Sequence, residues 1–258
     1  MQVKKEAFQR LLEIMDKLRA ECPWDKVQTN ETLRTLTIEE TYELSEAIVS
    51  GDDSAISKEL GDLLLHIVFY AKIGEEKGAF DITTVMEQLM EKLIYRHPHI
   101  FSDVKVQNAT EVEENWEQLK LKEKDGNKTV LSGVPKSLPA MIKANRIQDK
   151  VRGVGFDWED RSQVWDKLHE EFNELKAEIE KGNKNGIEDE FGDLFFSLIN
   201  TARLYNINPE DALERTNHKF INRFNYLEQQ TLQKGRNLKD MTLAEMDEIW
   251  EEAKRKEK

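Results

Sequence analysis

A set of four carboxylates occurs twice in the chain, with the same spacing each time. In each set, two acids three residues apart are followed by a second such pair, and the third acid lies sixteen residues after the second. Residues three apart lie on one face of an α-helix, so each pair presents two acids side by side. Two such helices packed together would gather four acids. The sets are Glu40, Glu43, Glu59 and Asp62, and Glu171, Glu174, Glu190 and Asp193.

The acids occupy positions where a helix normally places core residues. Leu36 and Leu44 flank the first pair at the helical period, and the second pair has matching apolar neighbours. The partner segments 60–70 and 191–199 are apolar on nearly every side, which is typical of interior helices. Unpaired buried carboxylates are costly, and oxygen-only ligand sets suit Mg²⁺ or Mn²⁺. We therefore predict that each set binds divalent cations; the alternative is that the acids edge a solvated helix face.

Composition favours an all-α protein. The 258 residues include only five Pro and twelve Gly, and long segments follow the helical period. The single cysteine, Cys22, excludes an internal disulfide framework and fits a reducing compartment. No apolar run reaches the roughly eighteen residues of a membrane span, and the chain opens on an amphipathic helix rather than a signal sequence. We expect a cytoplasmic protein with no membrane partner.

The chain is acidic, with a formal net charge of −13. This charge argues against a nucleic-acid partner bound through its phosphates. A small anionic substrate is compatible with it where bound cations reverse the local sign.

The repeated acids belong to a duplication that spans nearly the whole chain. Residues 36–62 align with 167–193 without gaps and share ten identities in 27 positions. A stretch rich in Gly, Pro, Ser and Asn separates the copies. The pattern predicts a helical domain over 1–125, a linker over 126–139 and a second helical domain over 140–258.

Two pairs of glycines are repeated with the acids. Gly51 and Gly182 follow the first acidic helix of each half, where a left-handed residue commonly ends a helix. Gly61 and Gly192 lie inside the second acidic helix, which costs about 1 kcal/mol relative to Ala. We expect tight packing of another helix at the second pair; a ligand approaching there is the alternative.

A basic pair is also repeated. Lys92 and Arg96 are four residues apart, as are Lys219 and Arg223, so each pair projects two cations from one helix face. They could bind phosphate oxygens, or they could form an exposed basic face. The sequence His97-Pro-His should end the first of these helices, whereas the second should continue and form the longer arm.

These residues resemble the MazG nucleoside triphosphate pyrophosphohydrolases over essentially the full chain. The resemblance rests on the two acidic sets, the first of which contains Glu59-Leu-Gly-Asp62. It also rests on Cys22-Pro-Trp-Asp25 and on Gly153-Val-Gly-Phe-Asp-Trp158. It implies all-α tandem halves that form four-helix-bundle-like cores, usually through dimerisation, and Mg²⁺-dependent cleavage of nucleoside triphosphates to monophosphate and pyrophosphate.

The resemblance also implies roles for individual residues. Metal ligands would be Glu171, Glu174, Glu190 and Asp193, and nucleotide contacts would be Lys167, Lys219, Arg223 and Trp250. In tandem members the C-terminal half carries most of the activity. This chain departs from that contrast, because its N-terminal half keeps all four acids together with Lys92 and Arg96.

The predicted function is therefore a Mg²⁺-dependent nucleoside triphosphate pyrophosphohydrolase of broad base preference. Glu171 and Glu174 would act at the catalytic metals, and Glu170 would be the general base or a partner of the ligands. Two alternatives remain open: a narrower hydrolase of the same fold, specific for dUTP or an alarmone, and a non-catalytic interaction protein that binds metal structurally.

Because each half offers more apolar helix surface than it can cover, we expect a homodimer.

Overall fold

The computed structural model describes residues 1–106, 108, 111–112, 115–116, 119–120, 129–157 and 161–256. Every regular element in these ranges is a helix, which confirms the predicted all-α class. The chain divides into two compact units, Met1–Val112 and Glu113–Lys258. The predicted domain junction at 125/126 and Trp158 of the Gly153–Trp158 motif lie outside the described residues.

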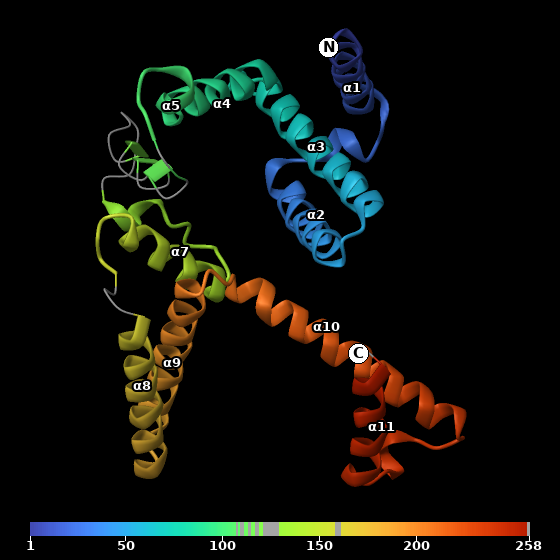
Figure 1. Cartoon of the computed structure of the whole chain (residues 1–258). Helices are drawn as coiled ribbons and strands as arrows, with labels where there is room; N and C mark the ends of the chain where they lie inside the picture. Colours follow the sequence, from blue (N-terminus) through green and yellow to red (C-terminus); the bar gives the residue numbers. More distant parts are fainter. Residues whose placement is uncertain are drawn as a thin grey trace. The chain divides into compact units, whose positions relative to one another are not determined.

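The first unit is built around a pair of long helices, α2 and α3, that lie side by side (Figure 1). The side chain of Thr29 accepts a hydrogen bond at the start of α2, and Asp52 does the same at the start of α3. Gly51, with a φ of 71°, ends α2 in the left-handed conformation, as predicted. The helices of this unit are α1 (Gln2–Glu21), α2 (Asn30–Ser50), α3 (Asp53–Glu76), α4 (Ile82–Arg96) and α5 (Pro98–Phe101).

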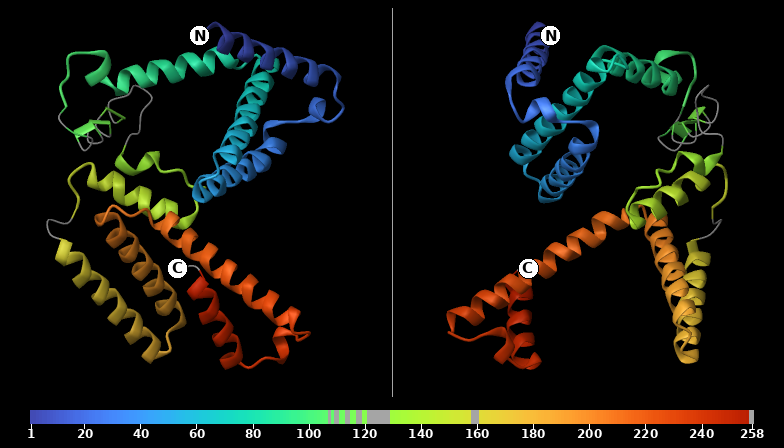
Figure 2. Two further views of the ribbon diagram at one scale, coloured as in Figure 1. Left: turned by 45° about the vertical axis from the view of Figure 1, so that its right-hand side comes forward. Right: turned by 180° about the vertical axis from the view of Figure 1, so that it is seen from behind.

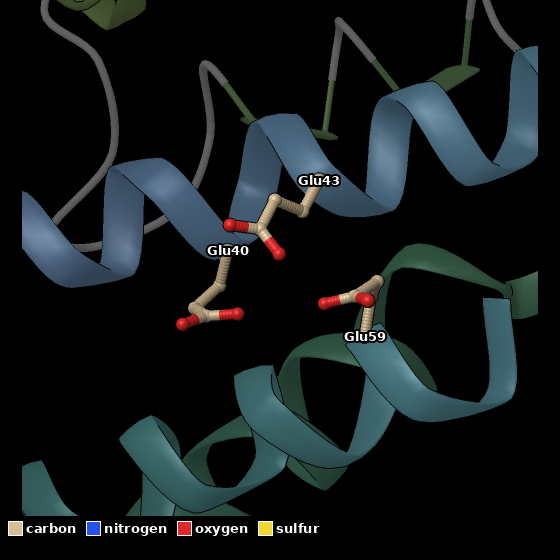
Figure 3. A group of neighbouring side chains, drawn as sticks. All are labelled: Glu40, Glu43 and Glu59. Atoms are coloured by element: carbon tan, nitrogen blue, oxygen red, sulfur yellow. The ribbon is translucent and has the colours of Figure 1, made fainter. Parts of the chain in front are cut away.

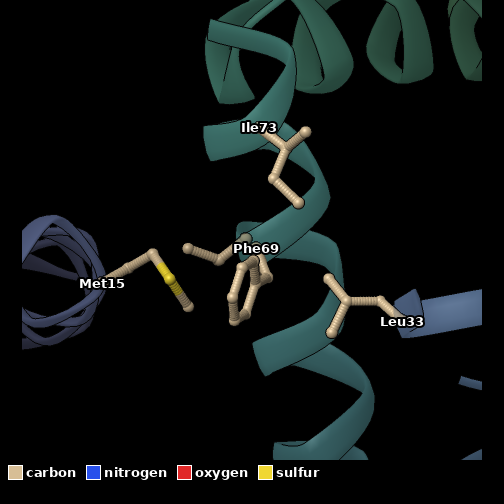
Figure 4. Close-up of a cluster of buried hydrophobic side chains, with 5 residues drawn as sticks. Met15, Leu33, Phe69 and Ile73 are labelled. Carbon is tan, nitrogen blue, oxygen red and sulfur yellow. The ribbon is translucent and has the colours of Figure 1, made fainter. Parts of the chain in front are cut away.

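The core of the first unit lies where α1, α2 and α3 meet (Figure 4). Phe69 of α3 projects between Met15 of α1 and Leu33 of α2, and all three side chains are almost completely buried. Each such side chain contributes about 1.5–3 kcal/mol through removal of apolar surface from water. Val68 and Ile73 complete the cluster.

The second unit contains two helix pairs, α8 with α9 and α10 with α11, and α7 contacts both α9 and α10. The α10–α11 pair diverges from the α8–α9 pair (Figure 2). Gly182, with a φ of 67°, follows the end of α8, as predicted. The elements are a 3₁₀ turn (Val130–Gly133), α7 (Ala140–Arg152), α8 (Arg161–Lys181), α9 (Lys184–Leu204), α10 (Pro209–Gln233), a 3₁₀ turn (Leu238–Asp240) and α11 (Leu243–Lys256).

The helices that carry the two basic pairs differ in length, as predicted. The first, α4, ends at Arg96, because the residue before a proline disfavours helical backbone and Pro98 follows His97. The second, α10, has 25 residues and runs ten residues beyond Arg223. The second unit therefore has the longer arm.

The expectation that segment 191–199 is interior is wrong for a single chain. The side chains of Phe191, Phe195, Phe196 and Leu198 are exposed along α9, because α8 and α7 cover only part of this helix. Across the residues described, no helix combines the length and apolar character needed to cross a membrane.

Candidate metal centre and substrate site

In the second unit, α8 and α9 bring three of the predicted ligands together. Glu171 and Glu174 of α8 and Glu190 of α9 each offer a carboxylate oxygen, and these oxygens lie within 4.8 Å of one another. Glu171 is buried, Glu190 is partly buried and Glu174 is exposed. The three-residue spacing on α8 and the packing of α9 against it therefore produce a compact carboxylate cluster, as the sequence predicts.

The electrostatics of this cluster are unfavourable without a cation. Burial raises the pKa of Glu190 above its ordinary value, and the charges of Glu174, Asp193 and Glu171 raise it further. The Oε2 atom of Glu190 is buried and has no hydrogen-bond partner among the described residues. A divalent cation bound by carboxylate oxygens would relieve both effects.

Among the described residues, Lys167 contacts this cluster through its ammonium group. Its Nζ lies 2.8 Å from a carboxylate oxygen of Glu171 and 3.0 Å from one of Glu170. These hydrogen bonds raise the pKa of Lys167, so the side chain stays charged at neutral pH. Lys167 thus joins Glu170, the candidate general base, to a predicted metal ligand.

Asp193 lies near the cluster but outside its most compact part. Its charge contributes to the raised pKa of Glu190, yet the side chain is exposed and the close group holds only the three glutamates. The structure therefore brings three of the four predicted ligands into one group and places the fourth at its edge.

The first unit contains the matching cluster. Glu40 and Glu43 of α2 and Glu59 of α3 turn their carboxylates toward the space between the helices (Figure 3), with oxygens within 4.8 Å of one another. Burial raises the pKa of Glu40, and so do the charges of Asp62 and the other two acids. Asp62 again lies at the edge of the group.

Lys58 is the cation at this first cluster. Its Nζ lies 2.8 Å from an oxygen of Glu59 and 3.7 Å from one of Asp62. The hydrogen bond to Glu59 is the main cause of the raised pKa of Lys58. The comparison of the two halves did not single out Lys58, because the second half has Asp189 and not a lysine at the equivalent position.

Three of the predicted nucleotide-contacting residues of the second unit, Lys219, Arg223 and Trp250, lie on the other helix pair, whereas Lys167 lies on α8 beside the acids. The guanidinium of Arg223 lies 5.9 Å from the centre of the Trp250 ring. The centres of the Phe220 and Trp250 rings lie 5.0 Å apart. Lys219 is exposed on the same helix. The structure brings Arg223 and Trp250 together, and it holds them on α10 and α11, which diverge from the acids on α8 and α9 (Figure 2).

The equivalent basic pair of the first unit lies on α4. Lys92 is exposed, and Arg96 is the last residue of the helix and partly buried.

The expected helix packing at Gly61 and Gly192 is wrong within the described chain. A Cβ added at either position would meet no atom within 4 Å, so the second acidic helix presents open surface there.

A cavity of about 480 Å³ adjoins the acids of the second unit. It extends from Glu171, Asp193 and Lys167 toward Gln148 of α7 and Asn200 of α9. The sequence analysis missed these last two residues, since neither carries a charge nor forms a motif. Asn200 has one signal in the sequence, because Phe69 stands at the same register of the first half, whereas Gln148 has none.

Fold and site together define a class: all-α proteins in which paired helices gather carboxylates suited to a divalent cation. The family model described as the MazG nucleotide pyrophosphohydrolase domain matches residues 28–101 and 160–227. The chain belongs to this family, with one matched segment in each half. The resemblance seen in the motifs is thereby confirmed.

Relatives match nearly the whole chain. A Thermotoga maritima protein named nucleoside triphosphate pyrophosphohydrolase/pyrophosphatase MazG is 42% identical over 250 residues, which cover 96% of this chain and 95% of the relative. The Escherichia coli (strain K12) nucleoside triphosphate pyrophosphohydrolase is 40% identical over 255 residues, covering 96% and 97%. The Bacillus subtilis protein YabN, named as uncharacterized, is 46% identical over 239 residues, which cover 92% of this chain and 49% of YabN.

Proposed function

We propose that this protein is a metal-dependent nucleoside triphosphate pyrophosphohydrolase of broad base preference. It converts a nucleoside triphosphate and water to the monophosphate and pyrophosphate. The observation that carries the proposal is the carboxylate group of Glu171, Glu174 and Glu190, whose oxygens lie within 4.8 Å of one another. Family membership and the names of the relatives that match end to end support the same activity.

The donor set fits Mg²⁺, with Mn²⁺ as a substitute. All the ligand atoms are carboxylate oxygens, which these hard cations prefer, and Glu190 has a buried oxygen without a partner in the described ranges. Glu171, Glu174 and Glu190 would hold the metal, and Asp193 would complete the set. When bound, the cation neutralises phosphate charge and lowers the pKa of water, the usual contributions of metals to phosphoryl chemistry.

The chain's own side chains would position the substrate and water. Lys167 keeps Glu170 and Glu171 in place through its two ion pairs. Glu170 is half exposed and close to the ligands, and it would accept the proton from the attacking water. Lys219 and Arg223 would bind the phosphates that leave as pyrophosphate, and Trp250 would contact the nucleotide. In the first half, Glu40, Glu43, Glu59 and Asp62 would bind metal, and Lys92 and Arg96 would contact nucleotide.

Product analysis tests this function directly. The protein is incubated with Mg²⁺ and each of ATP, GTP, CTP and UTP, and the phosphorus products are identified by ³¹P NMR. We expect monophosphate and pyrophosphate with every base, and loss of turnover when the cation is chelated. Diphosphate and orthophosphate as products would overturn the assignment, and turnover of UTP alone would make the enzyme a narrower hydrolase.

A pair of variants on one helix links the activity to the cluster. Glu171→Gln removes the charge of a buried acid at the candidate centre, and Glu180→Gln makes the same change at an exposed position further along α8. We expect turnover to be lost in the first variant and retained in the second. Equal effects would argue that the cluster is not the reaction site.

We also propose a homodimer, in which a second copy covers the exposed apolar side of α9. Light scattering at low micromolar concentration should then give about twice the chain mass of 30.2 kDa. A fully active monomer would contradict this assembly.

A further inference from the structure

The cavity beside the acids of the second unit is large enough for part of a substrate. Its volume of about 480 Å³ falls within the range of roughly 300–1,000 Å³ that is typical of small-molecule sites. At one end it is lined by Glu171, Asp193 and Lys167, and its other lining residues include Phe156 and Phe196. It therefore opens directly from the candidate metal centre into a partly apolar hollow.

Two polar side chains that line this hollow are buried and incompletely bonded. Gln148 is 4% exposed and Ser197 is 7% exposed. The Nε2 atom of Gln148 donates to the carbonyl oxygen of Phe196 at 2.8 Å, which fixes the amide between α7 and α9. Within the described part of the chain, its Oε1 atom and the Ser197 hydroxyl have no partner. Buried polar groups are nearly always paired, so these two atoms indicate a ligand.

Asn200 adds a donor at the same surface of the cavity. Its Oδ1 atom accepts hydrogen bonds from Nε and Nη2 of Arg203, at 3.1 and 2.9 Å. Arg203 is itself held by Asp157, to which it donates two further bonds. This chain of contacts fixes the orientation of the amide, so that the Nδ2 group of Asn200 is the end left for a ligand.

The first half carries a large core side chain where the second half carries Asn200. When the ungapped alignment is continued along the second acidic helix, Phe69 stands at the position of Asn200 and His66 at that of Ser197. Phe69 is 2% exposed and packs against Met15 in the core (Figure 4). The amide of Asn200 in place of a core phenylalanine therefore distinguishes the second half from its own duplicate.

We propose that this cavity binds the nucleobase of the substrate, and that Gln148, Ser197 and Asn200 bond to the polar edge of the base. An acceptor, a hydroxyl and a donor in a partly apolar hollow complement a flat heterocycle that carries both donors and acceptors. The Ser197 hydroxyl can either donate or accept a hydrogen bond, so it can pair with different bases, which fits broad base preference. The proposal rests on the proposed function, because cations bound by the acids at one end of the cavity must hold the phosphates.

The first test fills the cavity. Asn200→Phe places the residue of the first half in the second, and we expect the KM for ATP to rise by on the order of tenfold or more while the chain keeps its helical circular dichroism. Inorganic tripolyphosphate, which has phosphates and no base, serves as a competitive inhibitor. Its inhibition constant should stay within twofold. A parallel loss of tripolyphosphate binding, or an unchanged KM for ATP, would overturn the proposal.

The second test removes single hydrogen-bonding groups. Ser197→Ala and Gln148→Met should each change the ratios of kcat/KM among ATP, GTP, CTP and UTP by about three- to tenfold. Gln9→Leu, at an exposed glutamine of α1, should leave these ratios unchanged. A uniform loss for all four bases in both cavity variants would indicate a structural role and overturn the assignment.

Measurements of turnover and of binding distinguish failure of the base site from failure of the proposed function. If the wild-type protein released no pyrophosphate from any triphosphate, the proposed function would fail. The cavity would then be judged by equilibrium binding of ATP with Ca²⁺ or Mg²⁺. Weaker binding by Asn200→Phe than by wild type would support the base site, and equal binding would overturn it.

Discussion

The two acidic clusters have the same carboxylates and receive their lysine from opposite helices. In the first unit Lys58 of α3 pairs with Glu59, and in the second Lys167 of α8 pairs with Glu171. The alignment places Asp189 opposite Lys58 and Leu36 opposite Lys167, so neither lysine has a counterpart in the other half. Both helix pairs thus place a cation beside their acids, but only in the second does it also engage the neighbouring Glu170.

The surroundings of the clusters differ more than the clusters do. Beside the first, Phe69 packs into a solid apolar core; beside the second, Asn200 lines a cavity. The basic helix is interrupted after Arg96 in the first half and continues past Arg223 in the second. Duplication therefore preserved the pattern of carboxylates while the residues beside them diverged, and this favours the second half as the main reaction site in the proposed function.

The largest expected difference is between two metal-ligand variants. Glu174→Ala should reduce kcat by on the order of a hundredfold or more, because it removes a ligand from the half that has the cavity. Glu43→Ala, the matched change in the first half, should reduce kcat far less. Steady-state pyrophosphate release measures both. If the two effects were reversed, the first half would be the main reaction site.

The lysines should give a smaller contrast. Lys167→Met removes two ion pairs and should lower kcat/KM by about tenfold, as expected for loss of hydrogen bonds to charged groups. Lys58→Met should leave turnover nearly unchanged. Since Lys58 competes with metal for Glu59, its loss should tighten Mn²⁺ binding at the first cluster by about three- to fivefold, a modest effect because this lysine is exposed. Electron paramagnetic resonance titration of Mn²⁺ into Glu174→Ala variants with and without Lys58 isolates this site.

Alanine substitutions at Gly61 and Gly192 test whether a ligand or another helix contacts the open surface of α3 and α9. Gly61→Ala and Gly192→Ala should each raise the free energy of unfolding by roughly 1 kcal/mol, because alanine is the better helix former and its Cβ meets no neighbour. Urea unfolding of both variants measures this change. Destabilisation or loss of activity at Gly192 alone would show that a ligand or another helix approaches the second half there.

The smallest expected effect concerns pH. Burial lowers the pKa of His66, and Asp62 opposes this only in part, so the unfolded chain binds a proton more readily than the folded one. The stability associated with the neutral imidazole is fully present above the unfolded pKa of about 6.5 and is lost as the pH falls toward the folded pKa. His66→Ser, which introduces the residue of the second half, should therefore lose less stability than wild type between pH 7.5 and 5.5. An equal loss in urea unfolding would contradict this assignment.

Much of the candidate site could be predicted from the chain's periodicity. Glu171 and Glu174 three residues apart, and Glu190 on a second helix of matching pattern, sufficed to place three carboxylates together. The same spacing predicted Asp193 as an equal fourth member, whereas in the structure its side chain is exposed at the edge of the group, because spacing alone does not fix how α9 is turned about its axis. The sequence correctly predicted that the helix carrying Lys219 and Arg223 is longer than the one carrying Lys92 and Arg96. The separation of Lys219 and Arg223 from the acids depends on the direction in which α10 leaves α9.

The sequence by itself determined the helices, their ends and the acids they carry, because these depend on local backbone preferences and on spacing along one helix. Gly51, Gly182 and Pro98 ended helices where their own backbone geometry required. Only the tertiary structure decided which lysine enters each cluster and whether the adjoining space is filled by Phe69 or left open beside Asn200. These outcomes depend on side-chain volume and on contacts between helices distant in the sequence, which no local pattern encodes.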